Sequence, residues 1–180
     1  MAKEIEHKFL VANDIWRNSI KKRIHILDAL IFSKNTGKLR IRITDNKAFL
    51  TLKTKRILNY RDEYEYEIPY NDAIKIIETN SNGRIIEKYR NFIIHEKHIW
   101  EVDEYVGLLK GTIIAEIELN NFDEKFTKPE WVGEEITNNE RYRIINMINN
   151  KIEDNWNKNR EKMTKEAIGE YLFPKFSSYN

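Results

Sequence analysis

Seven segments of this chain alternate charged and apolar side chains with a period of two. This period is typical of a β-strand, because successive side chains of a strand point to opposite faces of the sheet. The charges are also sorted by sign, since three segments carry only bases and three carry only acids. In chain order the charged faces are Glu4, Glu6 and Lys8; Arg40 and Arg42; Lys53 and Lys55; Glu63, Glu65 and Glu67; Lys88 and Arg90; Glu101 and Asp103; and Glu116 and Glu118.

The sorting by sign favours a closed barrel over an open sheet. An open antiparallel sheet with one solvated face is stabilised when neighbouring strands carry opposite charges. Here two basic segments, around Arg42 and Lys53, are adjacent in the chain. Closing about eight strands removes the sheet edges and leaves an interior that side chains or one small ligand can fill. We therefore expect the apolar faces outside, under helices, and the seven bases and nine acids inside.

The turn residues and the hydrophobic periodicity divide the chain into strands and helices. The expected strands cover residues 3–11, 24–33, 38–45, 48–56, 61–69, 84–91, 93–103 and 111–121. Helices are expected at 13–23, 71–79, 138–156 and 156–172, the first three behind Asn or Asp caps and the last one ended by Pro174. This order predicts an α+β fold, with a domain at 1–150 and a helical extension at 151–180 packed on it.

An interior of this kind has specific chemical needs. Uncompensated charges in a low-dielectric interior are costly, so the barrel must hold water and counter-charges. Clustered carboxylates favour hard divalent cations, which take oxygen ligands. Clustered Arg and Lys favour phosphates, and Arg supplies its donors as a fork. An interior with both kinds of cluster predicts a site for a metal-bound polyphosphate.

The overall composition excludes several other classes of protein. The 31 bases nearly balance the 29 acids, which argues against a nucleic-acid-binding protein that relies on bulk positive charge. The absence of cysteine excludes disulfides and thiolate chemistry. Neither a signal-peptide pattern nor an apolar run of ~20 residues occurs. We expect a cytoplasmic protein with no nucleic-acid partner and no membrane partner.

The same segments resemble the CYTH superfamily of triphosphate tunnel metalloenzymes, which includes class IV adenylyl cyclases, thiamine triphosphatases and inorganic triphosphatases. The resemblance begins with EIEHKFLV, which contains the ExExK signature of that family. It continues in family order through LRIRI, LTLKTK, EYEYEIP, EKYR, WEVDEY, IAEIEL and WVGEEITNNERY, and covers about residues 1–145. Several motifs in the right order make the resemblance specific.

The resemblance implies an eight-stranded antiparallel tunnel that binds a triphosphate substrate together with Mg²⁺ or Mn²⁺. It implies that Lys8 lies near the scissile phosphoanhydride and that Glu116 is close to the metal, and we assign both as catalytic. The phosphate-binding residues are then Lys8, Arg40, Arg42, Lys53, Lys88 and Arg90, to which the charged faces add Lys55. The metal ligands are Glu4, Glu6 and Glu118, to which the charged faces add Glu65, Glu67, Asp103 and Glu116.

The reaction stays open at this point. We expect metal-dependent hydrolysis of inorganic tripolyphosphate or of an organic or nucleoside triphosphate. A class IV adenylyl cyclase that makes cyclic AMP and a weakly catalytic polyphosphate sensor are the alternatives. The chain departs from the family pattern at Ala29, where bacterial hydrolases often have tyrosine, and at Glu134, where many members have a base. The C-terminal extension is expected either to cap one tunnel mouth or to form a partner or homodimer contact.

Overall fold

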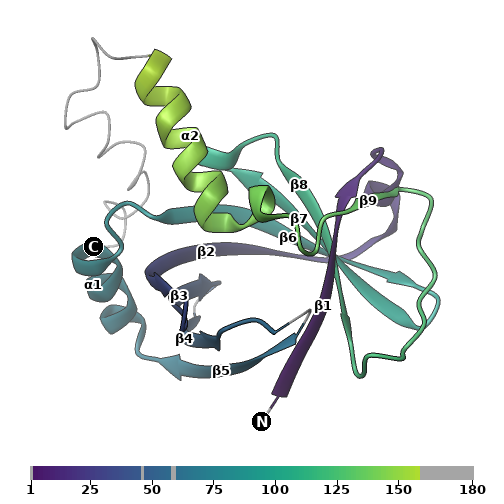
Figure 1. The fold of residues 1–180 in the computed structure, drawn as a ribbon, viewed down its shortest axis with the longest axis horizontal. Coiled ribbons are helices and arrows are strands. Elements are labelled where there is room, and N and C mark those ends of the chain that lie inside the picture. Colours follow the sequence, from purple (N-terminus) through teal and green to yellow (C-terminus); the bar gives the residue numbers. More distant parts are fainter. Residues whose placement is uncertain (1, 46, 58–59, 159–180) are drawn as a thin grey trace.

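Eight strands close into an antiparallel barrel, as the sequence predicts (Figure 1). The computed structural model describes residues 2–45, 47–57 and 60–158. The barrel strands are β1 (Ala2–Val11), β2 (Ile20–Lys34), β3 (Gly37–Thr44), β4 (Lys47–Thr54), β5 (Tyr60–Ile68), β6 (Ile85–His95), β7 (His98–Val106) and β8 (Ile113–Leu119). Around the barrel their order is β1, β5, β4, β3, β2, β6, β7 and β8, and β8 pairs with β1 again.

One edge of β1 is shared between two partners. Its first residues, Ala2 to Ile5, pair with β5, whereas Phe9 and Val11 pair with a ninth strand outside the barrel, β9 (Val132–Glu135). The segment after β9 stays on this edge, because the Ile136 amide donates to the Lys8 carbonyl at 2.7 Å. The middle of β1 is therefore held from outside at Lys8.

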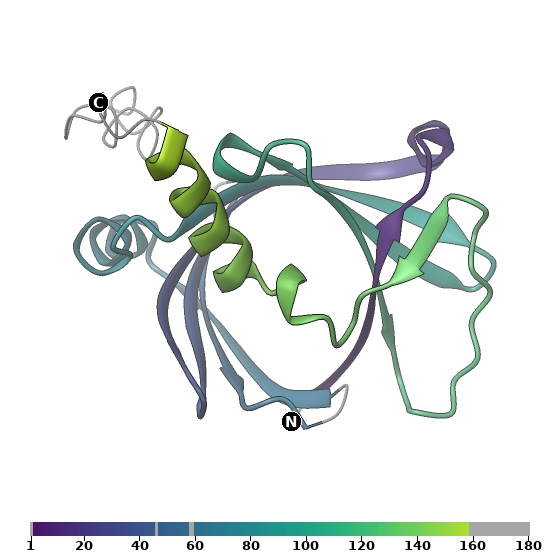
Figure 2. The ribbon, with the colours of Figure 1, turned by 45° about the horizontal axis from the view of Figure 1, so that its top comes forward.

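The helices cover the barrel from outside and across one end. They are η1 (Ile15–Ser19), α1 (Tyr70–Asn80), η2 (Gly107–Leu109), η3 (Glu140–Tyr142) and α2 (Ile144–Lys158). Figure 2 looks into the barrel and shows η3 and the start of α2 lying across its opening, while α1 packs beside the wall. Within the described ranges, no helix has the length and apolar character needed to cross a membrane.

The helix expected at 71–79 is confirmed as α1, but the one expected at 13–23 is wrong. Only a short 3₁₀ helix forms at Ile15–Ser19, and β2 begins at Ile20, which pairs with Ile93 of β6. The β-branched residues of this segment are better accommodated by strand pairing than by a helix. The helix expected at 138–156 is divided, because Arg143 is extended between η3 and α2. Residues 156–158 of the helix expected at 156–172 belong to α2, and the rest lies outside the described residues.

The sixth and seventh strands turn later than the sequence predicts. We placed this turn near residue 92, but the two strands run on to pair His95 with His98, and the turn lies at Glu96 and Lys97. No Gly, Pro or Asn marks it, and Glu96 itself takes the left-handed conformation with a φ of 53°. Side chains that usually signal a turn are missing here, so the pairing of the flanking strands decides its place.

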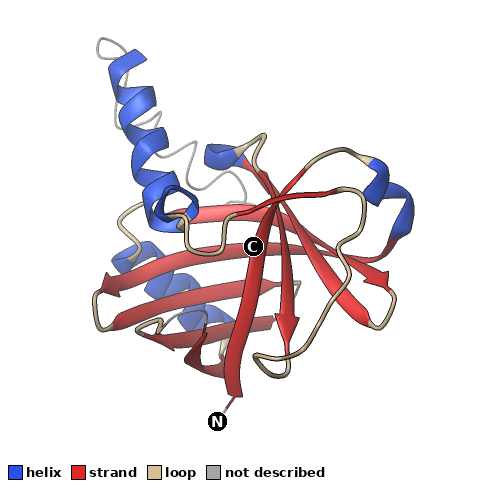
Figure 3. Cartoon of the chain, turned by 45° about the vertical axis from the view of Figure 1, so that its right-hand side comes forward, coloured by secondary structure: helices blue, strands red, loops and turns tan. Residues whose placement is uncertain are grey.

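The apolar core lies mainly outside the barrel wall. Around Phe9, Trp16 and Trp100, aromatic side chains pack beneath η1 and the loop before β9. A second cluster packs α1 against the wall, with Ala29 and Ile77 fully buried. In a third, residues of α2 pack on the end of the barrel. Figure 3 shows strands surrounded by these few helices. With its apolar faces turned outward, the barrel is left with a polar interior.

Candidate functional site

The interior of the barrel holds a cavity of about 840 Å³. Thirteen basic and eight acidic side chains line it, so positive charge is concentrated here although the whole chain is nearly neutral. The bases are Lys8, Lys34, Lys38, Arg40, Arg42, Lys53, Lys55, Arg56, Arg61, Arg84, Lys88, Arg90 and Arg143. The acids are Glu4, Glu6, Asp28, Glu63, Glu65, Glu101, Glu116 and Glu118. We expected more acids than bases, and the structure reverses that balance.

Most of the site residues predicted from sequence line this cavity, and two do not. Asp103 lies behind the lining, with no exposed surface, against Lys88 and Arg90. Glu67 continues the alternation of Glu63 and Glu65 but lies near the exposed end of β5, where it pairs with Lys47 at 3.0 Å. The predicted residues that do line it are Glu4, Glu6, Lys8, Arg40, Arg42, Lys53, Lys55, Glu65, Lys88, Arg90, Glu116 and Glu118.

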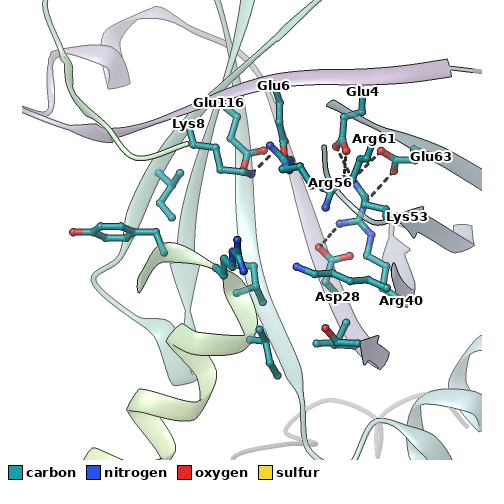
Figure 4. Close-up of a pocket in the computed structure, with 18 of the residues that line it drawn as sticks. Glu4, Glu6, Lys8, Asp28, Arg40, Lys53, Arg56, Arg61, Glu63 and Glu116 are labelled. Atoms are coloured by element: carbon teal, nitrogen blue, oxygen red, sulfur yellow. Dashed lines mark hydrogen bonds and ion pairs between the residues drawn. The ribbon is translucent and has the colours of Figure 1, made fainter. Parts of the chain in front are cut away.

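The acids of β1 are held by bases of β4, of the segment after β4, of the adjacent strand β5 and of β1 itself (Figure 4). Glu4 accepts hydrogen bonds from Lys53 Nζ at 2.6 Å and from Arg61 Nε at 2.5 Å. Glu6 forms salt bridges with Arg56 and, at 3.2 Å, with Lys8. Burial raises the pKa of Glu4, but the charges of Lys53 and Arg61 outweigh it and hold the pKa well below its usual range. Glu4 is therefore ionised at every physiological pH.

Lys8 connects Glu6 of β1 with the ion pair of Glu116 and Arg90. Its ammonium lies between Glu6 and Glu116, and Glu116 in turn accepts from Arg90 at 3.0 Å. Burial lowers the pKa of Lys8, but Glu116 and Glu6 raise it well above its usual range. A lysine in this state stays protonated, so Lys8 can donate hydrogen bonds and supply charge but cannot act as a general base.

Asp103 is the buried counter-ion of two phosphate-binding candidates. It accepts two hydrogen bonds of 2.7 Å from the Arg90 guanidinium and a third from Lys88. Burial raises the pKa of Asp103. The charges of Arg90 and Lys88 outweigh this effect, so the pKa lies below its usual range and the carboxylate stays ionised. All of its hydrogen-bonding capacity is directed at these bases, so in this arrangement Asp103 orients Arg90 from behind.

Asp28 is the buried counter-ion of the two bases of β3, Arg40 and Arg42. The charge pattern of the sequence did not identify Asp28 as a site residue. It accepts from Arg42 Nε at 3.1 Å and lies 3.6 Å from Arg40. Burial raises the pKa of Asp28, and Arg40 and Arg42 outweigh that effect and hold it far below its usual range. Within the described ranges, two buried guanidinium donors have no hydrogen-bond partner, Arg40 Nε and Arg56 Nη1. Unsatisfied buried donors of this kind are suited to an anion.

The acids suited to a cation meet where β1 and β8 pair. Glu6 and Glu118 are direct cross-strand partners, an arrangement that is destabilising for like charges. Burial and the charges of Glu4 and Glu101 raise the pKa of Glu118, which forms no hydrogen bond or salt bridge with any described residue. Oxygen ligands crowded in this way fit a hard divalent cation. Among the described residues no three acids or histidines are already arranged around a metal position, since Glu4 and Glu6 face Arg and Lys side chains.

Neither departure from the family pattern reaches the cavity. Ala29 is fully buried on the outer face of β2, in the cluster beneath α1, so its small side chain removes no group from the interior. Glu134 is exposed on β9. The neighbouring Glu135 hydrogen-bonds His7 and Thr137, and the Thr137 hydroxyl accepts from the Lys8 amide at 3.1 Å. This external group supports β1 at Lys8.

Comparison with known proteins gives the family. The model of the CYTH domain matches residues 2–147, which is most of the chain. The chain belongs to the CYTH family. A relative from Acetivibrio thermocellus, named inorganic triphosphatase, is 39% identical over 150 residues, covering 83% of this chain and 96% of the relative. A second inorganic triphosphatase, from Nitrosomonas europaea, is 31% identical over 145 residues, covering 78% of this chain and 93% of the relative.

The CYTH fold is also found in a solved structure. The crystal structure of an inorganic triphosphatase superposes on this chain with a TM-score of 0.59 at 28% sequence identity. The superposition covers 82% of this chain and 94% of the solved one. The relatives are therefore matched over nearly their whole length.

Proposed function

We propose that this CYTH protein is a divalent-metal-dependent inorganic triphosphatase. The observation that carries the proposal is the charged cavity of the closed barrel. Five bases face its interior from β3, β4 and β6, namely Arg40, Arg42, Lys53, Lys88 and Arg90. Such a set of bases fits a short polyanion better than any neutral substrate. The two curated relatives named inorganic triphosphatase support a linear triphosphate as that polyanion.

Substrate binding would exchange ion pairs already present in the cavity. The bases now face internal carboxylates such as Asp28, Glu63 and Asp103, so their side chains are positioned before any ligand arrives. Preorganised donors lose little conformational entropy when they bind, which favours affinity and correct placement of the phosphates. The unpartnered donors Arg40 Nε and Arg56 Nη1 offer the first new contacts.

Glu4, Glu6 and Glu118 would hold Mg²⁺ or Mn²⁺. A bound cation supplies Lewis-acid neutralisation of the phosphate charge. For Glu4 and Glu6, cation binding means release from their present partners, Arg61 and Arg56. The guanidiniums of Arg61 and Arg56 are then available to phosphate oxygens, so cation binding would also free donors for the phosphates.

Lys8 and Glu116 would act at the reacting phosphate. Hydrolysis forms a bond from a water oxygen to the terminal phosphorus and breaks its bond to the bridging oxygen, which leaves with pyrophosphate, while the water loses a proton to solvent. The protonated Lys8 can donate to the oxygen on which charge develops. Burial raises the pKa of Glu116, but Lys8 and Arg90 hold it well below its usual range, so Glu116 orients the water and is a poor proton acceptor.

The test is a product assay with tripolyphosphate, ATP, GTP and thiamine triphosphate, each with Mg²⁺ and with Mn²⁺. We expect orthophosphate from tripolyphosphate, and loss of at least about 100-fold in rate for Glu6→Gln, since a metal ligand is removed. Glu67→Gln is the matched control, because Glu67 continues the same face of β5 but lies outside the cavity. Cyclic AMP and pyrophosphate from ATP, with little orthophosphate from any substrate, would identify a cyclase instead.

A further inference from the structure

Lys8 lies at the place where β1 changes partners along one edge. Ala2 to Ile5 pair with β5 on this edge, and pairing with β9 begins at Phe9. In the described part of the chain, residues 6–8 have no strand partner there. A backbone amide in such a gap needs another acceptor, because an unpaired and buried polar group is costly. The backbone of Lys8 is therefore held by something other than the regular sheet.

The two residues that follow β9 hold this part of the backbone. The Ile136 amide donates to the Lys8 carbonyl at 2.7 Å, and the Lys8 amide donates to the Thr137 hydroxyl at 3.1 Å. In a regular antiparallel ladder a backbone carbonyl would accept from that amide. Here a side chain takes the place of the carbonyl, so the position of Lys8 depends on which residue stands at 137.

Glu135 orients the Thr137 hydroxyl. A threonine hydroxyl has one proton to donate, and Thr137 donates it to Glu135 Oε1 at 2.6 Å. Its lone pairs are then free to accept from the Lys8 amide. Burial raises the pKa of Glu135, but its hydrogen bonds with Thr137 and His7 hold the pKa below the usual range. The ionised carboxylate therefore keeps the hydroxyl proton away from the Lys8 amide.

These hydrogen bonds also decide where the Lys8 ammonium lies. The N–H and C=O of one strand residue point to the same edge, so both backbone groups of Lys8 point away from β8. On the β8 side Lys8 therefore stands opposite Glu116 as a non-hydrogen-bonded pair, the arrangement in which side chains are closer. The ammonium meets Glu116 and, at 3.2 Å, Glu6. A shift of the backbone at Lys8 would move the ammonium out of these contacts.

We propose that Thr137 is a positioning residue, which holds Lys8 at the place where its ammonium can serve the reacting phosphate. The inference rests on the proposed function, because it assigns a role within the same site. Thr137 lines the cavity, but its one proton is donated to Glu135, so it has none to offer to a phosphate oxygen. Thr137 therefore acts through Lys8. A misplacement of about 1 Å can lower a rate by about 100-fold, so one hydroxyl at this point can decide the rate.

Steady-state kinetics on tripolyphosphate with Mg²⁺ test the role of the hydroxyl. Thr137→Val keeps the shape of the side chain and removes the hydroxyl. We expect it to lower kcat by about 10- to 100-fold and to change KM by less than about threefold, since the phosphate-binding bases stay in place. Thr137→Ser should restore most of the rate. Thr127→Val is the matched control, because the Thr127 hydroxyl donates to Glu96 on the surface, outside the cavity.

A milder variant covers the case in which Thr137→Val does not fold. Glu135→Gln changes an exposed side chain and keeps the Thr137 hydroxyl, but it weakens the acceptor that orients this hydroxyl. We expect it to lower kcat by about two- to fivefold at an unchanged KM. An unchanged kcat would count against the proposal.

A double-mutant cycle tests whether Thr137 acts through Lys8. If it does, Thr137→Val should lower kcat by less than about twofold in a protein that already carries Lys8→Ala, because the group that it positions is gone. A loss of the same size in both backgrounds would show that Thr137 acts independently and would overturn the proposal. A raised KM at an unchanged kcat in Thr137→Val would overturn it too, since that result indicates a role in substrate binding.

Hydrogen exchange at the Lys8 amide tests the hydrogen bond without any turnover. We expect exchange to be at least about fivefold faster in Thr137→Val than in Thr127→Val, which corresponds to the loss of one hydrogen bond. Equal exchange in the two variants would overturn the proposal. Absence of hydrolysis by the unmodified protein would contradict the proposed function, whereas normal hydrolysis by Thr137→Val would contradict only this inference.

Discussion

Glu6 and Glu118 lie directly opposite each other on β1 and β8, although both are acids that face the cavity. Like charges in direct cross-strand positions weaken a sheet, and Glu118 has no compensating base among the residues that the structure describes. A divalent cation bound at this pair would relieve the repulsion.

Replacing Glu118 by Gln should therefore weaken Mg²⁺ binding, because an oxygen ligand with a full charge is lost. We expect the dissociation constant for Mg²⁺ to rise by about tenfold or more, as measured by calorimetric titration of the protein alone. The metal-free variant should melt no lower than the unmodified protein, since a repulsive pair has been removed. A lower melting temperature with unchanged Mg²⁺ affinity would show that Glu118 has a packing role instead.

Asp103→Asn should be far more destabilising than Glu67→Gln. Asp103 is fully buried against Arg90 and Lys88, so its neutralisation leaves two buried bases without their counter-ion. Breaking a buried ion pair costs about 3–5 kcal/mol, whereas an exposed substitution stays within about 0.5 kcal/mol. Urea denaturation measures both free energies of unfolding. Equal stability of the two variants would contradict the role of Asp103 as a structural counter-ion.

Tripolyphosphate with Mg²⁺ should stabilise the protein, because the ligands bind the folded state alone. At about 100 times the dissociation constant the gain is about 2.7 kcal/mol. In a chain of this length that raises the melting temperature by roughly 5–10 °C, which a thermal shift assay detects. Arg40→Ala should reduce the shift at a fixed ligand concentration. An equal shift with sulfate would indicate a general anion effect without a specific site.

Lys38 should make the free energy of unfolding depend on pH in the alkaline range. Its folded pKa of about 8 lies below that of the unfolded chain, so the unfolded state binds more protons between these two values. Lys38 is therefore destabilising below pH 8, and the effect is relieved as the pH rises above it. We expect Lys38→Met to raise the melting temperature at pH 7 and to raise it less at pH 10. A gain that is independent of pH would mean that only the packing of the side chain matters.

The alternation of charges was enough to predict the barrel and most of the charged residues that line the cavity, because a period of two fixes which face a residue takes. The same alternation also predicts that Arg61 and Lys38 face the interior, because they lie two residues before Glu63 and Arg40. It does not predict this for Arg56, which follows the regular part of β4. Asp28 is a single acid within the apolar run 26–32 of β2, and a lone charge gives no periodic signal.

The depth of each residue along the barrel could not be predicted. Glu67 and Asp103 both continue charged faces, yet one lies near the exposed end of its strand and the other behind the lining. Their depth depends on how the strands are staggered around the barrel, which a single strand does not encode. Arg143 was equally out of reach, since α2 brings it to the cavity from 103 residues beyond Arg40 by tertiary packing alone.

Because of the internal salt bridges, any ion that binds in the cavity must replace ion pairs that are already present. The inner bases already face carboxylates, and pairs of bases share one acid, as Arg40 and Arg42 share Asp28 and Lys88 and Arg90 share Asp103. A divalent cation and a polyphosphate bound together would offer new partners to the carboxylates and to the bases at once. A metal ion alone would leave the bases without a new partner, and a phosphate alone would leave the carboxylates without one. We therefore expect the barrel to bind the two ions together more tightly than either ion alone.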